Sequence, residues 1–155
     1  MNPKIVALVP MRHHSARVPQ KNYRPLAGKP LFHHILSILQ EVPEIDTTLV
    51  DTDSPVIMEG ISRNFPGVKS ISRPEYLLGE MVSMNEILIY DTSVLEADYY
   101  LQTHSTNPLL KSETISRAVQ TFLNNLPEND SLFGVTRLQT RLWDQDGKPI
   151  NHDPN

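Results

Sequence analysis

Residues 5–9 read IVALV, and residues 10–31 read PMRHHSARVPQKNYRPLAGKPL. A continuous apolar run of this kind is typical of a strand that is buried on both faces of a sheet. Before the first acidic residue, Glu41, the segment that follows the run carries five cations: Arg12, Arg17, Lys21, Arg24 and Lys29. A basic loop at the end of a first strand is well suited to hold phosphate groups.

Charge is distributed unevenly along the chain. Six of the 14 lysines and arginines precede Glu41, whereas all 18 acidic residues lie at or after it. A head of charge +6 is therefore followed by a body in which 8 basic residues stand against 18 acidic ones. Such a body would repel nucleic acid. We therefore expect a small anionic ligand and no nucleic-acid partner.

The composition indicates a single domain of the ordinary soluble kind. The chain has 155 residues, of which 39% are hydrophobic and 21% are charged. It has no cysteine, which excludes disulfides, thiolate metal sites and cysteine nucleophiles. The N-terminal apolar run is too short for a signal peptide, and no stretch approaches the roughly 20 apolar residues of a membrane helix. We expect a cytoplasmic protein without a membrane partner.

Strand-like and helix-like segments alternate along the chain. The pattern predicts strands at residues 5–9, 47–50, 68–71, 98–103 and 131–136. It predicts helices at residues 30–39, at 55–64 after an N-cap at Ser54, at 83–95, and at 113–126 after an N-cap at Ser112. This order predicts an α/β fold, with a mostly parallel sheet and helices on both faces. In such folds ligands bind beyond the carboxyl ends of the strands.

The pattern fades after Arg137. A turn is expected at Asp146-Gly147, and polar residues follow it. We expect residues 1–155 to form a single domain that is incomplete at its C-terminus, in which residues 137–155 begin a further lobe.

The basic loop resembles the opening signature of the CMP-sugar synthetases, the cytidylyltransferases that activate sialic acids and Kdo. That signature reads roughly P-A-R-G-G-S-K-R-I-P-x-K-N-x-x-x-L-x-G-K-P-L. The positions that match it are Pro10, Arg12, Ser15, Pro19, Lys21, Asn22, Leu26, Gly28, Lys29, Pro30 and Leu31. GKPL alone is a weak signal, because sugar nucleotidyltransferases in general share it, but the long signature is specific.

Later segments continue the resemblance over nearly the whole chain. Asp51-Thr52-Asp53 resembles the family's S-T-D, and Arg73-Pro74-Glu75 with Leu77 resembles its R-P-x-x-L. Ser83 fits a serine that follows. Residues 106–109, TNPL, are similar to the segment P-T-S-P-L-R.

The resemblance implies a Rossmann-like nucleotidyltransferase fold and a specific reaction. CTP and an acidic 2-keto-3-deoxy sugar would give a CMP-sugar and pyrophosphate, with Mg²⁺ bound mainly by acids beyond Asn155 and with a homodimer as the full-length protein. Arg12 and Lys21 would act in catalysis by stabilising charge on the phosphates. The nucleotide-binding residues would be Arg12, Ser15, Arg17, Lys21, Asn22, Arg73, Ser83, His104 and Thr106.

Two departures from the family pattern bear on the site. The family's paired glycines are His13 and His14 here, so the usual nest of backbone amides around phosphate is expected to be altered. The two rings could donate N–H groups instead, or lie in the loop without a catalytic role. His104 stands where the family usually has a glutamine that contacts the cytosine base, so base recognition is expected to differ.

Several alternatives remain open from the sequence. Asp51 and Asp53 are weak candidates for a magnesium site, against a role in helix capping and turn formation. Arg73 either contacts a ligand or forms a structural ion pair. The rival functions are a nucleotidyltransferase for another base or sugar, and a non-catalytic nucleotide-binding module. We expect these 155 residues to fold and bind nucleotide without catalysing transfer by themselves.

Overall fold

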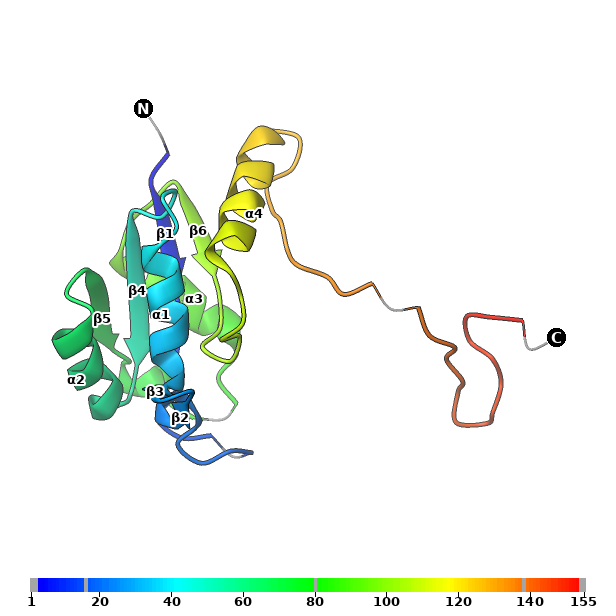
Figure 1. Ribbon diagram of the computed structural model, residues 1–155, viewed down its shortest axis with the longest axis horizontal. Coiled ribbons are helices and arrows are strands. Elements are labelled where there is room, and N and C mark those ends of the chain that lie inside the picture. Colours follow the sequence, from blue (N-terminus) through cyan, green and yellow to red (C-terminus); the bar gives the residue numbers. More distant parts are fainter. Residues whose placement is uncertain (1–2, 16, 80, 138, 154–155) are drawn as a thin grey trace.

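A parallel sheet forms the centre of the fold in the computed structural model, which describes residues 3–15, 17–79, 81–137 and 139–153. Its strands are β1 (Ile5–Leu8), β4 (Thr47–Thr52), β5 (Val68–Ser72) and β6 (Tyr99–Gln102), in the order β5-β4-β1-β6. The helices between and after them are α1 (Leu31–Gln40), α2 (Pro55–Asn64), α3 (Met84–Val94) and α4 (Ser112–Asn124) (Figure 1). The predicted α/β fold is confirmed.

Helices cover both faces of the sheet, and the alternation of side chains along β1 shows how. Ile5, Ala7 and Val9 join the core cluster that contains buried residues of α1, α2 and α4. Val6 and Leu8 join Leu49 in a second cluster, against which side chains of the α3 region pack. Because successive side chains of a strand point to opposite faces, one apolar strand supports both layers.

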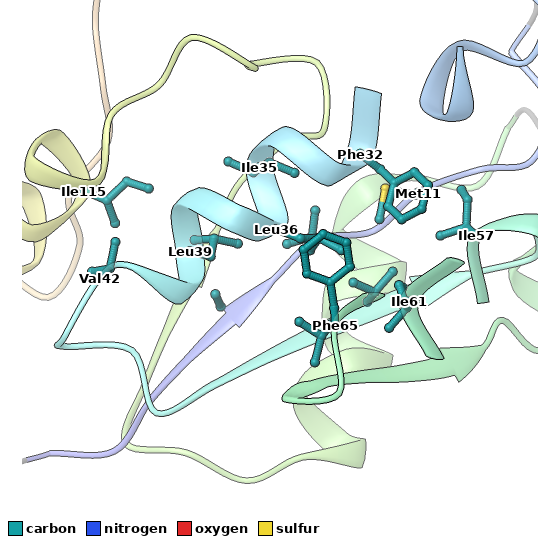
Figure 2. Packing of buried hydrophobic residues seen from close by; sticks show 14 of the residues in the cluster. Met11, Phe32, Ile35, Leu36, Leu39, Val42, Ile57, Ile61, Phe65 and Ile115 are labelled. Atoms are coloured by element: carbon teal, nitrogen blue, oxygen red, sulfur yellow. The ribbon is translucent and has the colours of Figure 1, made fainter. Parts of the chain in front are cut away.

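The main core lies beneath α1 and reaches the basic loop. Phe32, Ile35, Leu36 and Leu39 recur at helical spacing on the buried face of α1. Figure 2 shows Met11, at the start of the basic loop, beside Phe32. Burial of such a side chain contributes about 1.5–3 kcal/mol to stability. The basic loop is therefore anchored in the core at its start.

Helix starts follow the sequence signals closely. Ser54 caps α2, accepting a hydrogen bond from the Ile57 N–H, and Pro55 occupies the first helical position, as predicted. Lys111, and not the predicted Ser112, is the N-cap of α4, which is a difference of one residue.

A small hairpin closes the basic loop and returns the chain to α1. After a 3₁₀ turn, η1 (Lys21–Tyr23), the strands β2 (Pro25–Leu26) and β3 (Lys29–Pro30) pair antiparallel. Between them Ala27 and Gly28 have φ of 48° and 80°. Two consecutive positive φ angles are what a two-residue hairpin turn of the primed type requires, so glycine is well suited to the second position.

The strand predicted at residues 131–136 is wrong. These residues follow α4, form no strand, and are exposed, with Phe133 81% accessible. A strand needs a neighbour for its backbone groups, and no described residue pairs with this segment. Figure 1 shows the trace beyond α4 running outward from the sheet and helices.

The turn predicted at Asp146-Gly147 is present. The Asp144 carboxylate accepts hydrogen bonds from the N–H groups of Asp146 and Lys148, and Gly147 has a φ of 75°. Among the described residues, no helix has the length and apolar character needed to span a bilayer.

Candidate functional site

A cavity of about 740 Å³ opens at the carboxyl ends of β1, β4 and β6. Its walls come from the basic loop and η1 on one side, and from the segments that follow β4, β5 and β6 on the others. The polar residues that line it are Arg12, His14, Ser15, Arg17, Lys21, Asn22, Asp53, His104, Ser105 and Thr106. Parallel sheets place ligands at this edge, and most of the predicted site residues meet here.

The cationic side chains of the cavity have no carboxylate partner in the described part of the chain. Arg12, Arg17 and Lys21 form no ion pair there, and Asp53 is the only carboxylate among the described lining residues. Three fixed positive charges therefore face one negative charge across the cavity. Such a surplus attracts an anionic ligand and strengthens its binding.

Arg12 is held in place by a neighbouring loop. Its Nη2 donates to the Val82 carbonyl at 3.1 Å, in the segment that leads into α3. A guanidinium has five N–H donors in a planar fork, so further donors remain for a ligand. The contact fixes the guanidinium while leaving it available to the cavity.

Asn22 ties three segments together at the base of the cavity. Its Nδ2 donates to the Arg12 carbonyl at 2.7 Å, and its Oδ1 accepts from the Ser105 hydroxyl at 2.7 Å. Asn22 and Ser105 are both buried. Asn22 thus joins η1 to the basic loop and to the segment that follows β6. Its predicted contact with nucleotide would have to share atoms that already hold the loop.

The two histidines of the basic loop point in different directions. His14 is exposed and lines the cavity. His13 is turned toward the start of α2, where its Nδ1 lies 2.8 Å from the Ser54 hydroxyl. The His13 N–H donates to the Asp53 carboxylate at 2.6 Å. That amide is therefore occupied.

The structure places Arg73 and Asp51 away from the cavity. The Nε of Arg73 lies 3.1 Å from both carboxylate oxygens of Asp51, and its Nη2 donates to the Asp51 carbonyl at 3.2 Å. The two side chains are 2% and 0% exposed. Arg73 therefore takes the structural ion-pair role, and Asp51 is removed as a magnesium candidate.

The reason lies in the length and pleat of β4. The strand was predicted to stop at Val50, but it continues through Thr52, and this places Asp51 inside the sheet. Side chains alternate along a strand, so Asp51 shares the face of Leu49, which packs toward the α3 side. A carboxylate there needs a buried cation, and Arg73 supplies it.

Asp91 of α3 completes this buried group, named here the carboxyl cluster: Asp51, Arg73 and Asp91. No described N–H or O–H group donates to either carboxyl oxygen of Asp91. Burial, together with the charge of Asp51 and a hydrogen bond with its carboxylate, raises the pKa of Asp91 from its ordinary 3.8 to about 7, against the opposing effect of Arg73. Burial also raises the pKa of Asp51, against the opposing effect of Arg73. Protonated Asp91 can then donate a hydrogen bond to Asp51.

Ser83 is used as a helix cap. Its hydroxyl donates to the Glu86 carboxylate at 2.8 Å and accepts from the Glu86 N–H at 3.3 Å, while its own N–H donates to that carboxylate. This reciprocal arrangement is a capping box. The Ser83 side chain does not line the cavity, although Arg12, Ser15, His104 and Thr106, which were predicted with it to bind nucleotide, do.

Magnesium could be held only in part by the described residues. No group of three or more His, Cys, Asp or Glu side chains in the described ranges is placed to hold a metal ion. Magnesium is commonly bound by one or two carboxylates together with substrate phosphates. Asp53 fits the protein part of that arrangement, because it is the one carboxylate among the described residues that line the cavity.

Sequence reasoning did not single out the apolar side of the cavity or the role of Ser105. Leu78, Gly79 and Met84 line the wall between η2 (Glu75–Leu77) and α3. Their position after β5 was a signal, since loops beyond strand ends were expected to carry the site. Which side chains turn inward depends on how η2 and α3 pack.

The chain is similar to known proteins over most of its length. Residues 6–155 match the cytidylyltransferase family. The 3-deoxy-manno-octulosonate cytidylyltransferase of Escherichia coli is 25% identical over 129 residues, which are 83% of this chain and 48% of that protein. The pseudaminic acid cytidylyltransferase of Campylobacter jejuni subsp. jejuni serotype O:2 is 26% identical over 141 residues, 88% of this chain and 60% of that protein.

A solved structure supports the fold. CMP:2-keto-3-deoxy-manno-octonic acid synthetase complexed with CTP is similar with a TM-score of 0.69 at 24% identity, over 80% of this chain and 49% of that one. The chain thus spans about half the length of the first of these relatives and of this solved structure. Because the family match extends over nearly all of its residues, the chain belongs to the cytidylyltransferase family.

Proposed function

We propose that this chain binds CTP in the cavity and forms the nucleotide-binding part of a cytidylyltransferase that activates an acidic 2-keto-3-deoxy sugar. The observation that carries the proposal is the set of three cations, Arg12, Arg17 and Lys21, that face the cavity without a carboxylate partner in the described chain. The relatives named for acidic-sugar cytidylyltransferases support the choice of reaction. A sialic-acid-like sugar is the proposed acceptor.

The reaction needs no protein nucleophile. The anomeric hydroxyl of the sugar attacks the α-phosphorus of CTP and gives up its proton to solvent, the bond from that phosphorus to the bridging oxygen breaks, and pyrophosphate leaves. The protein contributes by holding the triphosphate in line and by stabilising the leaving negative charge. Arg12 would do this through its planar fork and Lys21 as a point charge, with Arg17 and Ser15 adding contacts from the same loop.

His104 and Thr106 lie on the side of the cavity that follows β6. We assign both side chains to nucleotide binding, with His104 in contact with the cytosine base. The Gln102 Nε2 lies 3.3 Å from the His104 Nδ1, which restricts the ring. Asp53, with phosphate oxygens of CTP, would supply ligands for Mg²⁺, whose chemistry here is to neutralise phosphate charge. We also propose that the whole protein is a cytoplasmic homodimer.

A nucleotide panel tests the central claim. Isothermal titration of CTP, UTP, ATP and GTP, each with and without Mg²⁺, should give tightest binding for CTP. Equal or tighter binding of ATP or GTP would exclude the cytidine assignment. It would favour a nucleotidyltransferase for another base, an alternative that rests on His104 in place of glutamine.

Turnover must be tested separately from binding. A pyrophosphate-release assay with CTP, Mg²⁺ and a panel of acidic sugars, on the longest available form of the protein, should show release that depends on the sugar. Tight CTP binding without release by that form would favour the non-catalytic module. The observation that favours a non-catalytic module is that the His13 N–H already donates to Asp53 and so is not free for a phosphate.

A further inference from the structure

His13 is fixed from three sides. Its N–H donates to the Asp53 carboxylate at 2.6 Å, and its Nδ1 lies 2.8 Å from the hydroxyl of Ser54, the buried N-cap of α2. Its ring stacks on Tyr23 of η1, with centroids 5.5 Å apart and planes inclined by 28°. His13 therefore links the basic loop to the end of β4, the start of α2 and η1, and its ring is not part of the cavity lining.

His14 is aimed the other way. Its ring meets the ring of His13 edge-on, with centroids 4.6 Å apart and planes inclined by 82°. The side chain is exposed and lines the cavity together with Arg12, Arg17 and Lys21. No described residue forms a hydrogen bond with either ring nitrogen of His14.

An imidazole in this place can replace a backbone donor. A neutral imidazole always carries one N–H, and the charged form carries two, so the ring can donate to an anionic oxygen in either state. The neighbouring amide of His13 cannot serve the ligand while it donates to Asp53. The ring of His14 therefore supplies a donor on the same segment of loop.

We propose that His14 is a phosphate-contacting residue of the cavity and that His13 is the positioning residue that aims it. The proposal rests on the proposed function in one respect only, that the phosphates belong to CTP. The ligand chemistry that it requires is a polyphosphate.

The first test compares His14→Ala and His14→Gln with the unaltered protein by titration of cytidine, CMP and CTP. Loss of one hydrogen bond to a charged oxygen should weaken CTP binding by about 10-fold or more in His14→Ala. Cytidine affinity should not change, and His14→Gln, which keeps an N–H donor, should recover part of the loss. Unchanged CTP affinity in His14→Ala, or an equal loss for cytidine, would overturn the proposal.

The second test separates aiming from contact. His13→Asn keeps a hydrogen-bonding atom near the place of Nδ1, whereas His13→Leu removes it. His13→Leu should lose CTP affinity as His14→Ala does, His13→Asn should lose less, and the double variant should be no weaker than His14→Ala alone. Additive losses would mean that His13 does not act through His14. Should His13→Leu fail to fold, the comparison of His13→Asn with His14→Ala in the double-variant cycle decides the same point.

Inorganic tripolyphosphate separates this proposal from the proposed function. Binding of tripolyphosphate that weakens in His14→Ala, without any binding of CTP, would uphold the role of His14 and refute the cytidine assignment. CTP binding that is unchanged in His14→Ala would refute the role of His14 and uphold the assignment of CTP. Binding of neither probe by the unaltered protein would refute both.

Discussion

Arg12 and Arg73 both follow strands of the sheet, and both belong to segments that resemble family signatures, yet the structure uses them differently. Arg12 is half-buried, donates to one carbonyl and faces the cavity. Arg73 is buried and bonded through Nε and Nη2 to Asp51. The difference shows that the partner of an arginine, more than its place after a strand, decides whether it can meet a ligand.

Charge is balanced by different means in the two regions. In the carboxyl cluster two acids face one guanidinium, and burial together with the charge of Asp51 raises the pKa of Asp91 to about 7, so that a proton removes the excess negative charge. In the cavity three cations face Asp53, and the excess is positive. In the carboxyl cluster, protonation of Asp91 balances the charge. In the cavity, an anionic ligand would balance it.

The largest effect should come from breaking the carboxyl cluster. Arg73→Met keeps the volume but leaves buried carboxyls without their cation, which typically costs about 3–5 kcal/mol in the free energy of unfolding. Urea unfolding at pH 7 measures this cost. Arg24→Ala is the matched control, because Arg24 is exposed and lies outside the cavity. A loss below about 1 kcal/mol would mean that Asp51 and Asp91 are satisfied without Arg73.

Substitution of the cavity cations should change CTP affinity, in contrast to the loss of stability expected for Arg73→Met. Arg12→Ala and Lys21→Ala should each weaken CTP binding by about 1.5–3 kcal/mol, since each removes a charge-assisted contact. The loss should be greater at low salt, where charges are less screened. Calorimetry of both variants beside Arg24→Ala gives the comparison. Unchanged affinity in both would reduce the loop to a solvated surface.

The proton in the carboxyl cluster should make stability depend on pH. Asp91 ionises near 3.8 in the unfolded chain and near 7 in the folded protein, so the folded state binds more protons between these values. Its contribution to stability is complete below the lower value and is lost as pH rises through the upper one.

Asp91→Asn isolates this effect, because an amide can still donate to Asp51 but does not ionise. Between pH 5 and 8 the unaltered protein should lose roughly 1–2 kcal/mol of unfolding free energy relative to the variant. This figure is a reduced share of the full pKa shift of Asp91, in which each unit corresponds to about 1.4 kcal/mol. Urea unfolding across that range measures it. Parallel pH curves for the two proteins would show that Asp91 is not protonated in the fold.

The smallest effect should come from Ser83, the N-cap of α3. Ser83→Ala removes the cap of α3 and should cost about 1 kcal/mol in unfolding free energy, with CTP affinity unchanged. Ser83→Thr keeps the hydroxyl and serves as the control. A loss of CTP affinity in Ser83→Ala but not in Ser83→Thr, at equal stability, would return Ser83 to the nucleotide-binding set.

Much of the fold could be predicted because it depends on local patterns. The apolar run at residues 5–9, the spacing of Phe32, Ile35, Leu36 and Leu39, and the Ser54-Pro55 helix start each specify an element through contacts within a few residues. The predicted strand at residues 131–136 failed for the complementary reason. The segment has a suitable β propensity, but a strand must pair its backbone groups with a neighbouring strand, and none of the described residues provides one.

The sequence predicted where the candidate site lies but not which way its side chains point. Residues after the strand ends do gather at one edge, which follows from a parallel sheet. The use of Asn22 as a clamp, the turn of His13 toward Ser54 and the burial of Arg73 depend on residues distant in sequence, such as Ser105 and Asp51.

By itself the sequence determined the α/β alternation, the basic loop after β1 and the resemblance to cytidylyltransferases, because short-range periodicity and residue identity carry that information. Only the tertiary structure decided which charges face a ligand. The length of β4 and its pleat turn Asp51 toward α3, where Arg73 and Asp91 meet it. Arg12, Arg17 and Lys21 find no such partner in the described chain, so their charge remains directed into the cavity. Burial and pairing distinguish the two sets of charges, and neither is a property of a residue alone.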